Sequence, residues 1–336
     1  MKIILIGEFL KSRLELSYKA SFESLGCRVF SFHTGIIPYI FKPLWQYTIS
    51  RKLLRNLNLI KPDLVMVMKG YFLSAQTIIK IKKLTNALIF CFNSDDPFNI
   101  SHIGSSNKDI IECIPYYDCY FTFSNILVEK IKAKGAKRVE YLPFGFDHHL
   151  HFPVKVSLKE KKIYGNDVVF VGNWSEERED YLKELLEFDL GIWGENYWKK
   201  FCKNKELKKK WRKKAAYGIE QAKILNSSKI SLNILRAQNK GSHNMRTFEL
   251  PACGAFVISE RSPEIEEFFK EDKELVLFSS SEELKEKIRY YLKNEEKRNE
   301  IAYNGFRRCI ESEYTYQARA KRILEVFDCL KDIKLL

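Results

Sequence analysis

One polar loop, residues 238–244, and the helix predicted after it, residues 245–253, carry side chains suited to binding an anion. Ser242 or Asn244 is expected to cap this helix. Backbone N–H groups left free at the start of a helix attract negative charge, and Arg246 adds a guanidinium that can hold a phosphate. The sequence therefore predicts a phosphate site at this loop.

Glu249 shares a helix face with Arg246, because residues three apart on a helix are neighbours. Its carboxylate could accept hydrogen bonds from a ribose diol while Arg246 holds a diphosphate. The same spacing also suits an ordinary ion pair between the two side chains, so both interpretations stand. His243, in the same loop, is the histidine we expect to contact the phosphates.

Two adjacent carboxylates, Asp95 and Asp96, follow the apolar run 87–92, which is predicted as a strand. Either could act as a general base that takes a proton from a hydroxyl. The run Ser94–Pro97 is also a good turn sequence, in which Asp side chains accept hydrogen bonds from backbone N–H groups.

Three histidines, His148, His149 and His151, stand close together beside Asp147. Three histidines within four residues of a loop rarely converge on one ion. We therefore expect an exposed loop here, and no metal site.

Short apolar runs alternate with amphipathic stretches along the first 150 residues. Strands are predicted over 2–6, 27–32, 64–68, 87–92, 118–123 and 139–142, with helices between them. This alternation predicts right-handed crossovers and a parallel, doubly wound sheet, in which function gathers at the carboxyl ends of the strands.

The alternation restarts after a Lys/Glu-rich stretch, residues 155–162, which is expected to be an interdomain linker. Strands are predicted over 167–171, 190–193, 230–235, 255–259 and 275–278, and the last helix over 314–330. The chain is thus predicted to hold two α/β domains. Neither first strand is followed by Gly-x-Gly-x-x-Gly, and no P-loop occurs, which argues against nicotinamide and P-loop sites.

The composition fits a folded protein of about two domains. The chain has 336 residues, 45% of them hydrophobic, and a formal net charge of +14. Ten Lys/Arg and one Glu fall in the sixteen residues 199–214, which form either a solvated helix face or a platform for an anionic partner. Nothing approaches a membrane span, and the scattered cysteines suit reduced thiols. We expect a soluble, cytoplasmic protein.

The stretch Asn244–Phe256 reads Asn-x-Arg-Thr-Phe-Glu-x-Pro-Ala-Cys-Gly-Ala-Phe. It resembles the donor-binding helix of GT-B glycosyltransferases in the group-1, GT4-like superfamily, in the branch related to the spore maturation protein CgeB. Three further segments resemble that branch in the same order: Phe92–Phe98, Tyr141–Asp147 with Phe152-Pro153, and Val169–Trp174. The resemblance covers roughly residues 60–325.

The resemblance implies the GT-B fold, α/β, with two Rossmann-like doubly wound domains facing a cleft. Residues 1–153 would form the acceptor domain and residues 165–313 the donor domain. The C-terminal helix, about 314–336, would cross back to the first domain.

The resemblance also implies a division of roles within the donor site. Glu249 would bind the donor ribose, and Arg246 with the backbone of Ser242, His243 and Asn244 would hold the diphosphate. Gly172 and Asn173 would border the phosphates, and Trp193 and Gly194 would lie near the base.

One position departs from the family pattern. Gly241 stands where the first Glu of the Glu-x7-Glu motif would be, so a retaining mechanism is not simply inherited. On the acceptor side, Gly7, Glu8 and His33 end predicted strands, and Asp95 or Asp96 would be the base. His33 could equally have a core or capping role.

We therefore expect a glycosyltransferase that moves a sugar from a nucleotide diphosphate sugar to a glycan, lipid-linked or protein acceptor, with no metal or other cofactor. Residues 199–214 would give peripheral contact with an anionic membrane at its inner face, and no specific nucleic acid is expected. Two alternatives remain: an inactive GT-B-like binding or structural protein, and a basic nucleic-acid-binding protein that uses 199–214.

Overall fold

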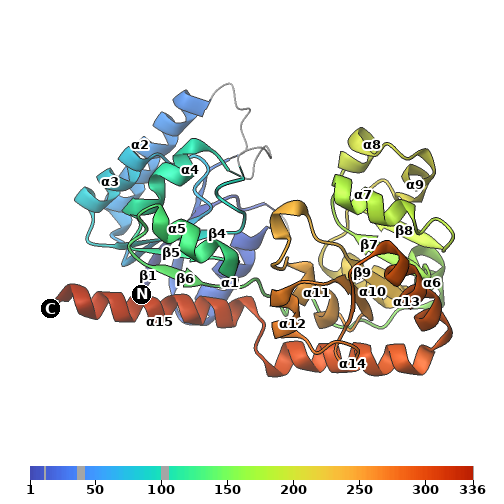
Figure 1. Ribbon diagram of the computed structural model, residues 1–336. Helices are drawn as coiled ribbons and strands as arrows, with labels where there is room; N and C mark the ends of the chain where they lie inside the picture. The colour runs from blue at the N-terminus through green and yellow to red at the C-terminus, as the bar shows by residue number, and fades with distance from the viewer. Residues whose placement is uncertain (11–12, 36–41, 100–105, 336) are drawn as a thin grey trace. The chain divides into compact units, whose positions relative to one another are not determined.

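The computed structural model describes residues 1–10, 13–35, 42–99 and 106–335 (Figure 1). The chain divides into two compact units. Unit 1 is formed by Met1–Pro143 together with Tyr316–Leu336, and unit 2 by Phe144–Thr315.

Unit 1 is built on a six-stranded sheet with the order β2-β1-β3-β4-β5-β6. Every neighbouring pair is parallel. Parallel strands covered on both faces are buried throughout, which is why β3 and β4 are continuous apolar runs rather than alternating ones. The strands are β1 (Lys2–Gly7), β2 (Arg28–His33), β3 (Leu64–Met68), β4 (Leu88–Asn93), β5 (Cys119–Thr122) and β6 (Val139–Tyr141).

The helices of unit 1 pack in two groups, α1 with α15 and α2 with α3, and α3 also contacts α4. Ser74 caps α3 by accepting a hydrogen bond from the N–H of Thr77, and Asn107 caps α4 in the same way through Ile110. The helices are α1 (Leu14–Ser24), α2 (Lys42–Ile60), α3 (Ala75–Leu84), α4 (Lys108–Cys113), α5 (Val128–Ala133) and α15 (Tyr316–Leu335).

The last helix, α15, completes the core of unit 1 although it follows the whole of unit 2 in the chain. Its buried face carries Ala320, Ile323, Val326 and Phe327. The ring centroids of Tyr316 in α15 and Tyr18 in α1 lie 5.4 Å apart. This apolar face holds the C-terminal end of the chain on unit 1.

Unit 2 is built on a five-stranded sheet with the order β11-β10-β9-β7-β8, again parallel throughout. Its strands are β7 (Val168–Val171), β8 (Leu190–Trp193), β9 (Ile230–Asn233), β10 (Val257–Glu260) and β11 (Val276–Phe278). Its helices are α6 (Leu158–Tyr164), α7 (Glu176–Lys183), α8 (Tyr197–Phe201), α9 (Lys205–Lys210), α10 (Gly218–Ser227), α11 (Arg246–Ala252), α12 (Pro263–Phe268), α13 (Ser281–Lys293) and α14 (Glu295–Glu311).

The prediction of two parallel α/β sheets is confirmed, but the predicted linker is wrong. Residues 155–162 lie inside unit 2, and most of them belong to α6, which begins with a capping box between Ser157 and Glu160. Glu160 also pairs with Lys223 of α10 at 2.7 Å. The Lys/Glu-rich composition is that of a solvated helix, and the units change at Pro143, earlier than the composition suggests.

The segments that lead into and out of unit 2 are joined to each other within it. The N–H of Phe146 donates to the carbonyl oxygen of Tyr314 at 2.9 Å, and Phe146 forms a parallel bridge with Thr315. A Cβ at Gly145 would lie 2.8 Å from the same Tyr314 oxygen, so this close approach requires glycine.

Among the described residues, no helix combines the length and the apolar character needed to cross a bilayer.

We predict that Ile323→Ala destabilises unit 1 by about 2–4 kcal/mol, because it leaves a cavity between α15 and the rest of the unit. Ile333→Ala in the same helix is the matched control, since Ile333 is 61% exposed. Urea denaturation followed by circular dichroism measures both. Equal midpoint shifts for the two variants would contradict the packing of α15 described above.

Candidate functional site

The ends of β7 and β8 meet at two glycines in unit 2. The N–H of Gly172 donates to the carbonyl oxygen of Trp193 at 2.8 Å. A Cβ at Gly194 would lie 2.2 Å from the carbonyl oxygen of Gly172 and 2.6 Å from Nε1 of Trp198, so only glycine fits there without a backbone shift. The predicted donor residues Gly172, Trp193 and Gly194 are thus in direct contact.

A buried arginine, Arg178 of α7, joins this loop to the neighbouring strand. Its Nε donates to the carbonyl oxygen of Ile234, beyond β9, at 3.0 Å, and its Nη1 donates to the carbonyl oxygen of Asn173 at 2.9 Å. The guanidinium lies over the ring of Phe170, 5.3 Å from its centroid. The Asn173 side chain in turn accepts a hydrogen bond from the N–H of Glu195 at 3.0 Å. Arg178 therefore holds the ends of β7 and β9 together.

Two further arginines, Arg236 and Arg246, act on the charge of Arg178. Burial, and then the nearby charges of Arg236 and Arg246, hold the pKa of Arg178 well below its ordinary value, against weaker opposing effects of Glu177 and Glu260. Within the described ranges, no carboxylate forms an ion pair with Arg178. A bound anion would relieve the mutual repulsion of these guanidinium groups.

Arg246 and Glu249, the residues singled out in α11, form an ion pair through Nη1 and Oε2. The Glu249 side chain is only 3% exposed, so this is not an ordinary surface pair. Arg246 also donates from Nε to the carbonyl oxygen of Val171 at 3.0 Å, directly before Gly172. The two α11 side chains therefore lie beside the loop that Arg178 organises.

His151 is buried, which makes the prediction of three exposed histidines wrong at this position; His148 and His149 are exposed. Its N–H donates to the carbonyl oxygen of Asp147 at 2.8 Å, a tight turn that carries the ring inward. Nε2 then lies 3.8 Å from Oε1 of Glu249. Burial, and secondarily the charge of Arg246, lower the pKa of His151 to about 4.

Ser242 and His243 turn into the core of unit 2. Nδ1 of His243 lies 2.6 Å from Oε2 of Glu264, and Nε2 accepts a hydrogen bond from the N–H of Phe144 at 3.0 Å. The hydroxyl of Ser242 donates to the same Glu264 oxygen at 2.8 Å. With both ring nitrogens used inside the protein, His243 holds the loop in place, and the expected phosphate contact through its side chain is not available.

Asn244 stands two residues before the start of α11, whose N-cap residue is Met245. Oδ1 of Asn244 accepts a hydrogen bond from the N–H of Thr247 at 3.1 Å, and its Nδ2 donates to Oδ1 of the buried Asn233 at 2.9 Å. The prediction of Ser242 or Asn244 as the N-cap residue is wrong, because the residue at that position is Met245, although the Asn244 side chain does satisfy one N–H of the first turn. The backbone N–H groups of Ser242 and Asn244, expected to be free for an anion, donate to Asn239 and to the Thr247 hydroxyl, respectively.

Trp193, expected near a bound base, is enclosed in unit 2. The ring centroid of Tyr164 lies 5.8 Å from its own, and Nζ of Lys214 lies 5.5 Å from the centroid. Its indole Nε1 is buried and has no hydrogen-bond partner in the part of the chain that the structure describes.

In unit 1, the two candidate bases lie in a turn directly after β4. Asp95 forms an ion pair with Lys69, which follows β3, with Nζ and Oδ2 2.5 Å apart. Oδ1 of Asp96 accepts a hydrogen bond from the N–H of Phe98 at 2.8 Å. Asp96 thus has the turn role that its sequence also suggested, whereas Asp95 faces a cation.

Gly7, Glu8 and His33 come together at the ends of β1 and β2. Gly7 and His33 are register partners, and Nδ1 of His33 accepts a hydrogen bond from the N–H of Phe9 at 3.1 Å. The N–H of Glu8 donates to Oε1 of Glu15 at 3.0 Å. Burial raises the pKa of that Glu15 carboxyl. His33 therefore has a capping role in this loop.

Three residues of the site were not found from the sequence: Arg178, Glu264 and the inward-facing His151. Arg178 stands in the run Glu176–Glu179 and reads as one more charge on a solvated helix. Its only sequence cue is its position six residues after the glycine that ends β7. Within the described residues, no cluster of three or more His, Cys, Asp or Glu side chains could hold a metal ion.

Comparisons with known proteins identify the fold. Residues 176–325 match the model of a family described as glycosyl transferase-like. A sucrose-phosphate synthase from Thermosynechococcus elongatus is similar over 99% of this chain and 100% of its own, with a TM-score of 0.76 and 11% identity. No curated protein sequence matches the chain.

Two further solved structures are similar over nearly the whole chain. Anabaena HepE, in complex with UDP and glucose, has a TM-score of 0.70 and 12% identity, with 98% of this chain and 100% of that chain covered. A glycosyltransferase from Rickettsia africae has a TM-score of 0.68 and 13% identity, with 97% of each chain covered. The two parallel sheets and these likenesses confirm the GT-B fold class.

We predict that His151 makes the protein acid-sensitive. Its pKa of about 4 lies below its ordinary value of 6.5, so the unfolded chain binds this proton first as the pH falls. The contribution of the neutral His151 to the free energy of unfolding is fully present above about pH 6.5. About 3 kcal/mol of that free energy is lost as the pH falls from there to pH 4. His151→Asn, which keeps an acceptor for the N–H of Asp147, should flatten this dependence, whereas His149→Asn should not. Parallel stability curves for wild type and His151→Asn, measured by urea denaturation across this range, would overturn the assignment.

Proposed function

We propose that the protein is a glycosyltransferase that takes a sugar from a nucleotide diphosphate sugar. The observation that carries the proposal is the position of two arginines beside the strand ends: Arg178 donates to the carbonyl oxygens of Asn173 and Ile234, and Arg246 donates to that of Val171. In the GT-B fold this place lies at the carboxyl ends of parallel strands, where ligands of doubly wound sheets bind. HepE, a neighbour of the same fold, is described in complex with UDP-glucose.

The diphosphate would lie beside the loop at Gly172 and Asn173. Arg178 and Arg246 both donate to backbone carbonyls next to these residues, so their guanidinium groups are already oriented. Fixed positive charge stabilises the negative charge that develops on a leaving diphosphate at little reorganisation cost. The same charge would replace a divalent cation, which supports transfer without a metal.

We propose that Glu249 contacts the donor ribose. Its two carboxylate oxygens lie in different environments. Oε2 pairs with Arg246, whereas Oε1 faces His151 at 3.8 Å. When the diphosphate engages Arg246, the carboxylate loses part of this ion pair and becomes a stronger acceptor for ribose hydroxyls. Arg246 and Glu249 would thus exchange their contact with each other for contacts with the donor.

For the acceptor, we propose Asp95 as the general base, because Asp96 is occupied in the turn. The ion pair with Lys69, with Nζ and Oδ2 2.5 Å apart, orients the Asp95 carboxylate. The finer assignments also remain proposals: the CgeB-related branch, transfer of a hexose, and a glycan, lipid-linked or protein acceptor.

Residues 199–214, expected to contact an anionic membrane, form α8, α9 and the loops beside them in unit 2. Part of their positive charge is balanced by carboxylates: Lys203 pairs with Glu176, Lys209 with Glu206 and Lys214 with Glu220. These pairs weaken the attraction of this segment for anionic lipid or nucleic acid.

We predict that Arg246→Gln lowers the affinity for UDP and UDP-sugars by about 10- to 100-fold, the loss expected when one charged hydrogen bond to phosphate is removed. Arg289→Gln, which breaks only the exposed pair with Glu187, is the control. Isothermal titration calorimetry measures both after a thermal-shift screen of nucleotide sugars has identified the donor. Unchanged affinity of Arg246→Gln would refute the diphosphate site, and tight donor binding without any turnover by the wild type would favour the inactive binding protein.

We predict that Asp95→Asn lowers the transfer or donor-hydrolysis rate by about 10²- to 10⁴-fold while donor affinity stays unchanged. Asp96→Asn should stay within a few-fold of wild type, because the amide oxygen can still accept the hydrogen bond from Phe98. Steady-state release of the nucleotide diphosphate reports the rate. If both variants remain within a few-fold of wild type, Asp95 is not the base.

A further inference from the structure

The two helices α2 and α3 of unit 1 are basic and free of acidic residues. Together, Lys42–Ile60 and Ala75–Leu84 contain seven Lys/Arg and no Asp or Glu. The chain as a whole has 57 Lys+Arg and 43 Asp+Glu, so an acid-free pair of helices is unusual for this protein. Neither helix belongs to the phosphate or acceptor residues discussed above.

One face of α2 combines this charge with exposed apolar side chains. Its members follow one another at spacings of three and four residues, which places them on one side of a helix: Leu44, Tyr47, Arg51, Arg55 and Leu59. Leu59 is 74% and Leu44 68% exposed, and Tyr47 is exposed as well. The opposite face, with Ile49, Leu53 and Leu57, is buried in unit 1. An outward face that is both apolar and basic is typical of a helix that lies in a membrane interface.

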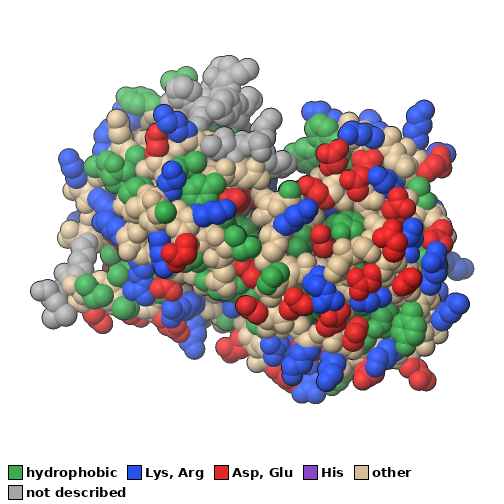
Figure 2. Space-filling view, viewed as in Figure 1, with side chains coloured by type: hydrophobic (Ala, Val, Ile, Leu, Met, Phe, Trp, Pro, Cys, Tyr) green, Lys and Arg blue, Asp and Glu red, His purple; other side chains and the backbone are tan. Residues whose placement is uncertain are grey.

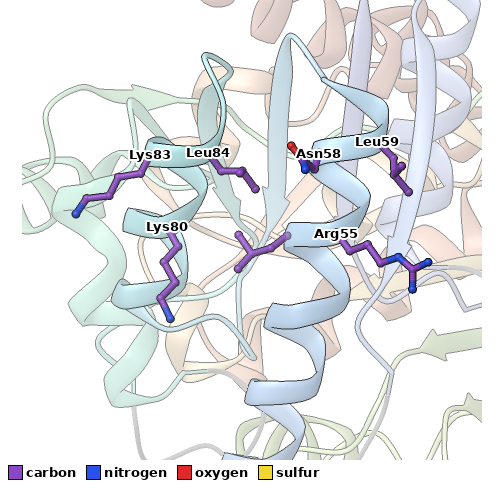
Figure 3. Close-up of a pocket in the computed structure, with 7 residues that line it drawn as sticks. Arg55, Asn58, Leu59, Lys80, Lys83 and Leu84 are labelled. Atoms are coloured by element: carbon purple, nitrogen blue, oxygen red, sulfur yellow. The ribbon is translucent and has the colours of Figure 1, made fainter.

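An open groove of about 530 Å³ separates α2 from α3. Its lining combines apolar side chains, Leu54, Leu59 and Leu84, with the cations Arg55, Lys80 and Lys83. Figure 3 shows Leu84 extending from α3 toward α2, while Arg55, Lys80 and Lys83 extend outward from the two helices. The hydroxyls of Ser50 and Thr77 are hydrogen-bonded at 2.8 Å and hold the helices together beneath this surface.

The cations of this face are not neutralised within the described part of the chain. Arg51, Arg55, Lys80 and Lys83 form no ion pair there, in contrast to the paired lysines of the segment 199–214, which are Lys203, Lys209 and Lys214. In the space-filling view, blue and green side chains predominate over α2 and α3, at the upper left (Figure 2). Positive charge without local carboxylates attracts an anionic surface most strongly.

We propose that the α2–α3 face, defined by Leu44, Tyr47, Arg51, Arg55, Leu59, Lys80, Lys83 and Leu84, docks unit 1 onto a membrane that contains anionic phospholipid. The arginines and lysines lie at the level of the lipid phosphates, and Leu44, Tyr47 and Leu59 enter the interface between headgroups and acyl chains. Each basic residue near such a surface strengthens binding by about fivefold.

The occupant is a lipid surface rather than free phosphate or a nucleotide. The cations of the groove extend away from one another instead of converging on a point, as the close-up shows (Figure 3). The face also exposes large apolar side chains, Leu44, Tyr47 and Leu59, and water-soluble anions gain nothing from leucine and tyrosine. This docking is independent of the sugar-transfer chemistry proposed for unit 2.

The test is sedimentation of the full-length protein with extruded vesicles of phosphatidylcholine, with and without phosphatidylglycerol. Wild type should bind only the vesicles that contain phosphatidylglycerol, and added salt should weaken binding. Arg55→Glu/Lys80→Glu/Lys83→Glu should reduce the binding constant by about 100-fold or more. Leu44→Ser/Tyr47→Ser/Leu59→Ser should reduce it too, at unchanged net charge.

The matched control is Lys199→Glu/Lys205→Glu/Lys210→Glu, which changes the net charge by the same amount in the other basic segment of the protein. It should bind the vesicles within about threefold of wild type, since local charge rather than total charge sets the attraction. Hydrogen–deuterium exchange of the wild type supplies a readout that needs no variant. Vesicles should protect residues 44–59 and 76–84.

Any of four results would overturn the proposal. The first two are no binding of the wild type to phosphatidylglycerol vesicles and an equal loss of vesicle binding in the control variant. The other two are release of the protein by millimolar inorganic phosphate at constant ionic strength and protection from exchange confined to residues 199–214. Activity on a soluble acceptor should be the same in all three variants. Docking and sugar transfer can therefore fail separately.

Discussion

A buried positive charge, that of Arg178, is the constraint on which the candidate site of unit 2 depends. The guanidinium reaches two backbone carbonyls from neighbouring strand ends and lies over Phe170, so it fixes the loop after β7. A charge held out of water in this way is costly, and Arg236 and Arg246 increase the cost. A bound anion would lower this cost, which is why we propose donor binding at this place.

Two pairs of polar side chains in unit 2, each containing a glutamate, have different roles. His243 and Glu264 are fully enclosed, each bonded to several partners, and they fix the loop before α11. Arg246 and Glu249 are bonded to each other beside the loop at Gly172, where a ligand could replace the contact. The His243–Glu264 pair therefore stabilises the fold. The Arg246–Glu249 pair is the one that a ligand could open. The residue types in the sequence do not show which of these pairs is structural and which could bind a ligand.

The sheets were predictable because strands buried on both faces leave short, continuous apolar runs, such as Leu64–Met68 and Val168–Val171, where a half-buried strand would alternate with polar residues. The site was predictable only where a strand ends, as at Gly172. Burial of a polar side chain is decided by residues far away in sequence. His151 becomes internal because of α11, and Arg178 because of the loop after β9, so a local pattern could not reveal either. The Lys/Glu-rich run 155–162 was predicted as a linker but mostly forms α6. A solvated helix and a linker have similar compositions, so the local sequence does not distinguish them.

The return of α15 to unit 1 has a consequence for biogenesis. During synthesis the ribosome releases residues 1–143 long before Tyr316–Leu335, so the first unit waits for its last helix while the second, continuous in sequence, can fold at once. Until then the surface that Ile323 and Phe327 will cover is open, and the nascent chain is a natural client for chaperones that bind apolar surface. A premature stop anywhere before residue 316 would therefore damage the unit that was made first.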